Sequence, residues 1–150
     1  MKTKQVIVVI KKYADQYRGK MMAQVAHASI GALLKFAAKE ECSFLPGGAY
    51  EPGQKHYKYS LDFQEGSVLD EWLNGLFTKT VLYVETEEEL LELQKKCSDE
   101  TLFPIPIPNC LITDSGLTVF HGQPTVTCLG IGPWDADEIN KVTGHLSLLK

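Results

Sequence analysis

Runs of apolar residues alternate along the chain with stretches in which apolar positions recur every three or four residues, and this alternation predicts strands separated by helices. The run KQVIVVI at 4–10 is continuous and β-branched, which is typical of a strand buried on both faces of a sheet. Shorter runs of the same kind predict further strands at 78–85, 109–114 and 124–133. The first strand is therefore expected at the centre of the sheet.

Four helices are predicted from apolar spacing and from the polar residues that precede it. The longest is expected from Arg18 to Ala38. The others are expected at 67–76, 86–97 and 136–143, because each begins with a capping box, in which a Ser, Thr or Asp precedes an acidic residue by three positions. The capping pairs are Ser67 with Asp70, Thr86 with Glu89, and Asp135 with Glu138.

The remaining segments have the composition of loops. Residues 11–17 predict a polar loop, and 103–109 an extended connector, because its prolines are unsuited to an interior strand. Residues 44–66, rich in Pro, Gly and aromatic residues, predict a long loop insertion with a short hairpin at 56–63. The order of elements predicts an α/β fold, a four-stranded mixed sheet with helices on both faces, as a single domain over 1–150.

The charge distribution is uneven. Hydrophobic residues make up 44% of the chain and charged residues 23%, as in a globular protein, and the net charge is −4. The first 20 residues nevertheless carry +5, so the remainder carries −9. Two interpretations stay open: a local positive field that attracts a polyanion, or lysines that merely keep a strand soluble.

The sequence has no recognisable cofactor, metal or targeting motif. Its cysteines and histidines are scattered without C-x-x-C or H-E-x-x-H spacing, which predicts reduced thiols and no metal. It has no G-x-G-x-x-G or Walker loop, so no nucleotide cofactor is expected. No apolar run approaches the roughly 20 residues that span a bilayer, and VIVVI is too short for a signal peptide, which predicts a cytoplasmic protein without membrane contact.

Polar chemistry gathers on one face of the longest predicted helix. Lys20, Gln24 and His27 recur at i, i+4 and i+7, opposite an apolar stripe. That stripe consists of Met22, Ala26, Ile30, Leu33 and Ala37. Taken singly, a lysine and a glutamine usually face water, and a histidine is usually a core side chain with its hydrogen bonds made. Because the three share one face, close to a helix N-terminus that suits an anion, the pattern favours a functional site.

A second polar group follows the strand at 109–114. Asp114, Ser115 and Gly116 stand at its C-terminal end, where α/β sheets usually present ligand groups, although Asp-Ser-Gly is also an ordinary turn. In the long loop, aromatic residues interleaved with Lys55 and Lys58 would suit stacking on bases, or simply fasten the loop to the domain.

Four motifs in this order resemble those of the peptidyl-tRNA hydrolase 2 family. They are GKMMAQVAHAS at 19–29, TDSG at 113–116 with a threonine shortly after, TVTCLGIGP at 125–133, and KVTGHLSLL at 141–149. The likeness extends to KQVIVV and TEEELLEL and so spans most of the chain, apart from 44–66. It implies a mixed four-stranded α/β fold, commonly a homodimer, that hydrolyses the ester between a peptide and tRNA.

The resemblance also implies a site. The family motif falls on Lys20, Gln24, His27, Asp114, Thr118 and Thr125. Substrate contacts are further expected from Ser115 and Gly116 beside the motif, and phosphate contacts from Lys11, Lys12 and Arg18. The chain departs from the family at two positions, because Ser115 stands where alanine is frequent and Leu117 where a basic residue or histidine is frequent.

The expected reaction is attack of water on the ester without a metal or a covalent intermediate. Asp114 would orient or deprotonate the water, and Lys20 would stabilise the oxyanion or hold the terminal phosphate. Gln24 and Thr118 would position the ester, while His27 would orient Asp114 or act as an acid. Two alternatives stay open: a non-catalytic module that binds tRNA or a protein, and a hydrolase of small esters or amides.

Overall fold

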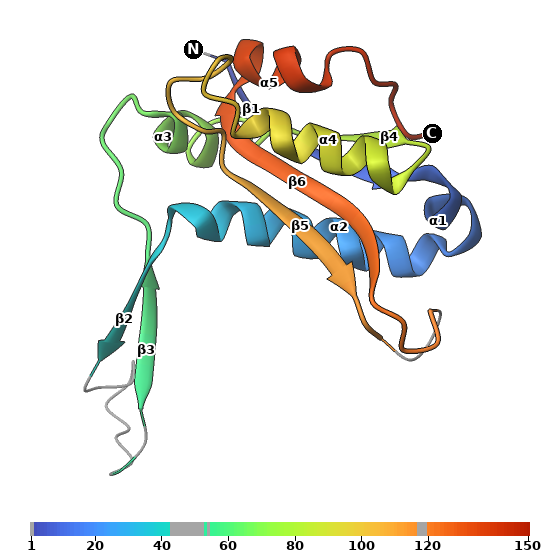
Figure 1. The fold of residues 1–150 in the computed structure, drawn as a ribbon. Coiled ribbons are helices and arrows are strands. Elements are labelled where there is room, and N and C mark those ends of the chain that lie inside the picture. The colour runs from blue at the N-terminus through green and yellow to red at the C-terminus, as the bar shows by residue number, and fades with distance from the viewer. Residues whose placement is uncertain (1, 43–52, 54, 117–119) are drawn as a thin grey trace.

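A four-stranded mixed sheet forms the centre of the fold, in a computed structural model that describes residues 2–42, 53, 55–116 and 120–150 (Figure 1). The strand order is β4-β1-β6-β5, with β1 parallel to β4 and the other neighbours antiparallel. The strands are β1 (Thr3–Ile10), β4 (Lys79–Val84), β5 (Asn109–Asp114) and β6 (Thr125–Asp135). The four predicted strands and the mixed α/β class are confirmed, and β1 lies inside the sheet, as its unbroken apolar run predicts.

Residues that the sequence predicts for the site lie together at one end of the sheet. Since β6 runs antiparallel to both β1 and β5, the C-terminal ends of β1 and β5 lie together, beside the start of β6. Lys11 follows β1 directly, and Asp114 is the last residue of β5. The register therefore brings the basic N-terminal segment and the predicted carboxylate to the same end of the sheet.

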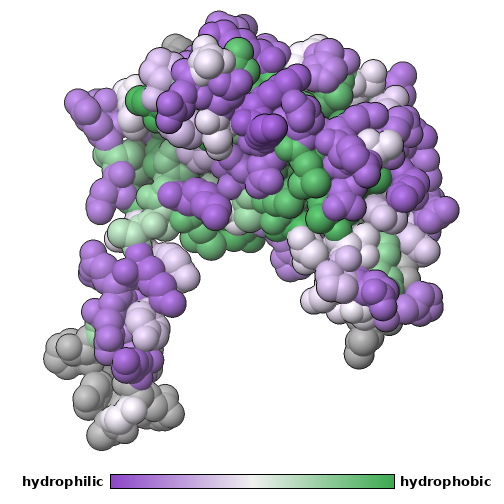
Figure 2. All heavy atoms as spheres, viewed as in Figure 1, coloured by the Kyte–Doolittle hydropathy of each residue, from purple (hydrophilic) through white to green (hydrophobic). Residues whose placement is uncertain are grey.

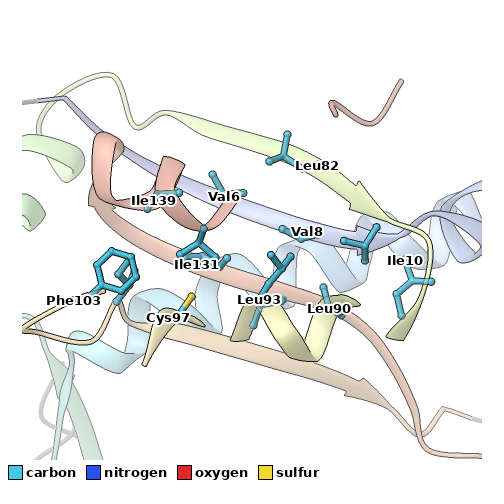
Figure 3. Close-up of a cluster of buried hydrophobic side chains, with 14 residues drawn as sticks. Val6, Val8, Ile10, Leu82, Leu90, Leu93, Cys97, Phe103, Ile131 and Ile139 are labelled. Atoms are coloured by element: carbon cyan, nitrogen blue, oxygen red, sulfur yellow. The ribbon is translucent and has the colours of Figure 1, made fainter. Parts of the chain in front are cut away.

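Two helices cover one face of the sheet, α4 (Glu87–Cys97) and α5 (Ala136–Thr143) (Figure 1). The space between them and the sheet is filled by buried aliphatic side chains such as Val8 on β1, Leu90 on α4 and Ile139 on α5 (Figure 3). All three predicted N-cap residues cap their helices, because each capping side chain accepts a hydrogen bond from the backbone N–H three residues on. These N-caps start α3 (Val68–Leu73), α4 and α5.

The other face is covered mainly by α2 (Arg18–Leu33), which packs on β6 through small residues. Ala28 is fully buried, and a Cβ placed on Gly130 of β6 would overlap the Ala28 carbonyl oxygen. The large side chains of the apolar stripe point elsewhere, with Met22 69% and Ile30 60% exposed. The face that carries Ala28 and Ala32 permits close backbone contact with β6, so that face is buried instead of the one with Met22 and Ile30.

A buried glutamine connects α2 to the sheet. Gln5 of β1 is fully buried and donates from Nε2 to the carbonyl oxygens of Ser29 (2.9 Å) and Gly132 (3.1 Å). The Ser29 hydroxyl donates to Oε1 of Gln5 at 2.5 Å. A buried amide that lost these partners would cost free energy, so this network fixes the position of α2 along the sheet.

The segment predicted as a polar loop is instead a short helix, α1 (Lys11–Gln16). Its Ala14 is buried, and Lys11 pairs with Asp15 across one turn at 2.7 Å. Six residues are too few to show a helical period in the sequence, and an isolated helix of this length is unstable without packing. The loop prediction was therefore wrong because the sheet supplies the missing stabilisation.

A two-stranded ribbon stands apart from the main body (Figures 1 and 2). Its strands are β2 (Ala38–Cys42) and β3 (His56–Ser60), paired antiparallel. The predicted helix ends early, at Leu33, with a 3₁₀ turn over Leu34–Phe36, and the predicted local hairpin at 56–63 is replaced by this longer-range pairing. Lys58 faces Glu40 across the strands at 3.4 Å. In the described part of the chain, no helix is both long and apolar enough to cross a bilayer.

We predict that Gly130→Ala lowers the free energy of unfolding by about 1–3 kcal/mol, because the added methyl group forces α2 away from β6. Urea denaturation monitored by circular dichroism measures this. The matched control is Gly19→Ala in the first turn of α2, where an added Cβ meets nothing within 4 Å and a helical alanine is favoured. Equal stability of the two variants would contradict the packing argument.

Candidate active site

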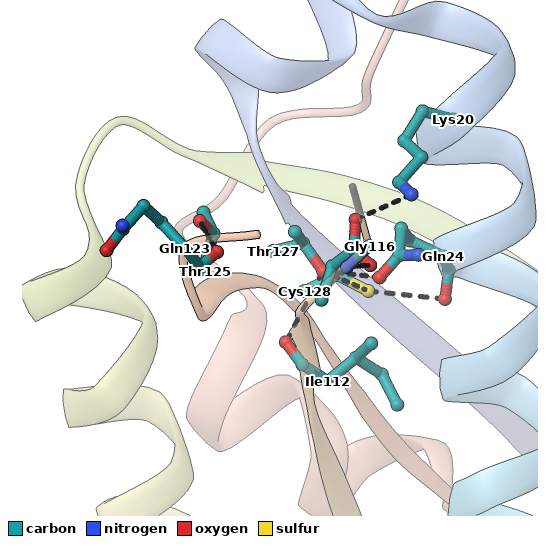
Figure 4. Close-up of polar contacts among 9 residues, drawn as sticks. Lys20, Gln24, Ile112, Gly116, Gln123, Thr125, Thr127 and Cys128 are labelled. Atoms are coloured by element: carbon teal, nitrogen blue, oxygen red, sulfur yellow. Dashed lines mark hydrogen bonds and ion pairs between the residues drawn. The ribbon is translucent and has the colours of Figure 1, made fainter. Parts of the chain in front are cut away.

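An ion pair between α2 and β5 is the centre of the site. Lys20, in the first turn of α2, places Nζ 2.7 Å from Oδ2 of Asp114, the last residue of β5 (Figure 4). Their side chains are only 21% and 10% exposed. The backbone N–H of Gly116 donates to the other carboxylate oxygen at 2.9 Å. Both carboxylate oxygens of Asp114 are therefore held in fixed positions at the end of β5.

The surroundings keep Asp114 ionised. The pKa of its carboxyl group is lowered from the usual value, first because Lys20 donates a hydrogen bond to it. The Gly116 N–H and the charges of Lys20 and His27 also lower this pKa, whereas burial opposes them. Asp114 is a carboxylate throughout the neutral range, which suits it to accept a hydrogen bond from water better than to retain a proton.

Gln24 is buried on the same helix face and is held by β6. Its Oε1 accepts a hydrogen bond from Thr127 Oγ1 at 2.9 Å, and its backbone carbonyl accepts one from the Cys128 thiol at 3.4 Å (Figure 4). Burial raises the pKa of Cys128 to about 12, so its thiol stays protonated and is unsuited to nucleophilic attack. The sequence interpretation had overlooked Thr127, although it lies two residues after Thr125 and so recurs with strand spacing.

A polar pocket of about 500 Å³ opens beside the ion pair. It is lined by Gln24 and His27 of α2, by Asp114 and Ser115, and by the stretch 111–113 of β5. The fold thus brings four of the predicted residues to one cavity from two distant segments. Such a cavity can hold a carbonyl group beside the fixed carboxylate of Asp114, which is itself paired with the Lys20 ammonium.

The other predicted residues lie around this pocket or away from it. Thr125 is the pairing neighbour of Asp114 in β6, and its hydroxyl donates to the Gln123 carbonyl oxygen at 2.9 Å. Arg18 lines a separate groove on the opposite flank of α2. A Cβ placed on Gly116 would lie 2.9 Å from Lys20 Nζ. Thr118 and Leu117 lie outside the described residues.

The basic residues of α1 differ in their surroundings. Lys11 is engaged by Asp15, and the pKa of Lys11 is raised first by that hydrogen bond. Lys12 is exposed, with Nζ 5.0 Å from the centroid of the Tyr13 ring. Across the described ranges, no group of three or more His, Cys, Asp or Glu residues is arranged to hold a metal ion.

An α/β protein with an ion-paired lysine and carboxylate at a polar pocket has the groups that polarise a carbonyl and orient a water molecule, as many hydrolases do. Comparison with known proteins is more specific. The chain matches the family described as "Peptidyl-tRNA hydrolase PTH2" over residues 3–149, and it belongs to that family. The resemblance seen in the four sequence motifs is thereby confirmed.

Similar proteins from archaea match over nearly their full length. A protein of Methanopyrus kandleri named "Peptidyl-tRNA hydrolase" is 40% identical over 96% of this chain and 97% of its own. Proteins with the same name from Thermococcus sibiricus (33% identical) and Methanocaldococcus jannaschii (32% identical) each match 95% of this chain and 95% and 97% of their own.

We predict that Asp114→Asn lowers the free energy of unfolding by about 1–3 kcal/mol at pH 7, because Lys20 loses a charged partner. The pKa of Asp114 is lower in the folded than in the unfolded protein, so the ion pair stabilises above the unfolded value near 4 and is lost as pH falls through the folded value. The difference between wild type and variant should therefore be constant from pH 7 to about 5 and shrink below about 4.

Urea denaturation between pH 3 and pH 7 measures this difference. The control is Asp15→Asn, whose ion pair with Lys11 is exposed, with side chains 55% and 37% accessible, and should contribute little at any pH. A stability difference for Asp114→Asn that grew towards pH 3 would contradict the direction of the pKa shift.

Proposed function

We propose that the protein hydrolyses the ester that joins a peptide, or an N-blocked aminoacyl group, to the 3′ end of tRNA, and so releases free tRNA for reuse. The observation that carries this proposal is the Lys20–Asp114 ion pair at the polar pocket, in a chain that belongs to the peptidyl-tRNA hydrolase family. The relatives named above support it, because they match almost the entire chain. Since translation produces this substrate, the proposed compartment is the cytoplasm.

In the proposed mechanism a water molecule hydrogen-bonded to Asp114 attacks the ester carbonyl. The fixed carboxylate orients the water and accepts its proton as the C–O bond forms, while the Lys20 ammonium stabilises the oxyanion. Collapse of the tetrahedral intermediate breaks the bond to the 3′ oxygen, which takes up a proton and leaves with the tRNA. His27, exposed on the same face of α2 and close enough to act on Asp114 electrostatically, is assigned to orientation of Asp114 or to proton supply.

Gln24, Thr118, Thr125 and Ser115 complete the proposed site as groups that position the substrate. For Gln24 the supporting feature is its hydrogen bond to Thr127, which fixes the amide at the wall of the pocket. Phosphates of the tRNA are assigned to Lys12, with Lys11 and Arg18 further out. A homodimer is part of the proposal, supported by the exposed Met22 and Ile30 on the outer flank of α2.

Release of tRNA from an N-acetylated aminoacyl-tRNA, in the presence of a metal chelator, tests the function. We predict turnover by wild type and a loss of about 10²- to 10⁴-fold in kcat for Lys20→Ala and for Asp114→Asn, because each removes a positioned charge. Lys95→Ala, an exposed lysine in the last turn of α4, is the control and should act as wild type. Folded wild type that binds tRNA without turnover would favour the binding module.

We predict that Gly116→Ala reduces kcat on the order of 10²-fold while leaving the free energy of unfolding within about 1 kcal/mol of wild type. The added methyl group would lie 2.9 Å from Lys20 Nζ and 3.1 Å from Asp114 Oδ1. Lys20 ends in a flexible chain and can move aside at little cost, but the ion pair then loses its alignment. The same assay measures kcat, with Gly19→Ala as the matched control. Normal turnover by Gly116→Ala would show that this alignment is unimportant.

A further inference from the structure

Three aromatic rings cluster at the start of α2 and have no part in the chemistry proposed above. Phe120, in the connection between β5 and β6, packs against Tyr13 of α1 with ring centroids 5.0 Å apart and planes at 73°. It also packs against Tyr17 at 5.6 Å and 83°. Tyr17 is the N-cap residue of α2, three positions before Lys20. The rings therefore border the site on the side of the helix start.

A backbone hydrogen bond connects the residues after Phe120 to the residues after Asp114. The Gly122 N–H donates to the Gly116 carbonyl oxygen at 3.3 Å, and the Gly116 N–H in turn donates to Asp114. His121 and Gly122 have φ of 52° and 75°, in the left-handed region, which returns the chain towards β6 directly after Phe120. A non-glycine residue in that region costs free energy and often marks a functional segment.

Positive charge flanks the rings on two sides. Lys12 Nζ lies 5.0 Å from the Tyr13 ring centroid, and Lys20 follows Tyr17 by one helical turn. Lys12 is exposed, whereas its neighbour Lys11 is engaged by Asp15. Aromatic faces combined with nearby ammonium groups are the chemistry that binds single-stranded nucleic acid, since bases stack on the rings and phosphates pair with the cations.

The cluster is not closed off from solvent. Trp72 and Phe103 elsewhere in the fold are, by contrast, almost fully buried. Tyr13, Tyr17 and Phe120 are each half-buried and keep part of their surface in solvent.

We propose that Tyr13, Tyr17 and Phe120 form the surface on which the unpaired 3′-terminal base of the substrate RNA stacks, with Lys12 on a neighbouring phosphate. The inference rests on the proposed function, because an ester at the 3′ end of tRNA brings an unpaired base to the side of Asp114. The rings act as binding residues, because stacking would hold the end of the RNA near the Lys20–Asp114 pair.

Titration of the protein with the ribotrinucleotide CCA, followed by NMR, tests this directly. The ring protons of all three residues should shift upfield as the terminal base stacks, and an oligonucleotide with an abasic 3′ residue should leave them in place. Tyr17→Leu and Phe120→Leu should each weaken CCA binding by roughly 5- to 150-fold. Tyr17→Phe should bind as wild type, because it keeps the ring.

Tyr57→Leu is the matched control, since Tyr57 is 50% exposed on the β2–β3 ribbon, away from the site. Ring protons that do not respond to CCA, or a loss of affinity in Tyr57→Leu but not in Tyr17→Leu, would overturn the proposal. Thermal unfolding of each variant checks that it is folded. If Phe120→Leu does not fold, Tyr17→Leu alone provides the test.

Turnover separates this inference from the proposed function. On N-acetylated aminoacyl-tRNA, Tyr17→Leu should raise KM while kcat stays within a few-fold of wild type. Wild-type turnover without a ring response to CCA would refute the stacking surface and leave the hydrolase standing. A ring response without wild-type turnover would support the stacking surface and refute the hydrolase.

Discussion

The structure depends on the close contact between α2 and β6. Where Ala28 meets Gly130 the two backbones approach to a distance that admits no further side chain. The polar contacts from Gln24 to Thr127 and from Ser29 to Gln5 then fix the helix along the sheet. Because α2 begins over the end of β5, this position also decides where its first turn lies, and so creates the site.

The site balances burial against charge. Removing a lysine and a carboxylate from water is costly unless each keeps a partner, and here the two groups partner one another while a backbone N–H holds the second carboxylate oxygen. The same contacts that lower the pKa of Asp114 keep it in one orientation. A carboxylate held in this way is a weak base in water but a well-oriented acceptor for a bound water molecule, which favours hydrolysis by positioning.

Much of the fold could be read from local signals. The four strands and the three capped helices were predicted close to their observed bounds, because period, capping and turn residues act within a few positions. Three features were not predicted: the helix α1, the early end of α2, and the pairing of β2 with β3. Two of them depend on a partner distant in sequence. For α1 that partner is the sheet surface beneath Ala14, and for β2 it is β3.

The sequence by itself determined which residues are candidates for the site: Lys20, Gln24 and His27 share a helix face because helical geometry is local, and the motif around Asp114 resembles that of a known family. Only the tertiary structure decided how they meet. Gln24 and Thr127 are 103 positions apart, and no local rule relates them. The physical reason is that the helix is buried by the face that permits close backbone approach, which requires Gly130 on β6 as well as the small residues of α2 itself.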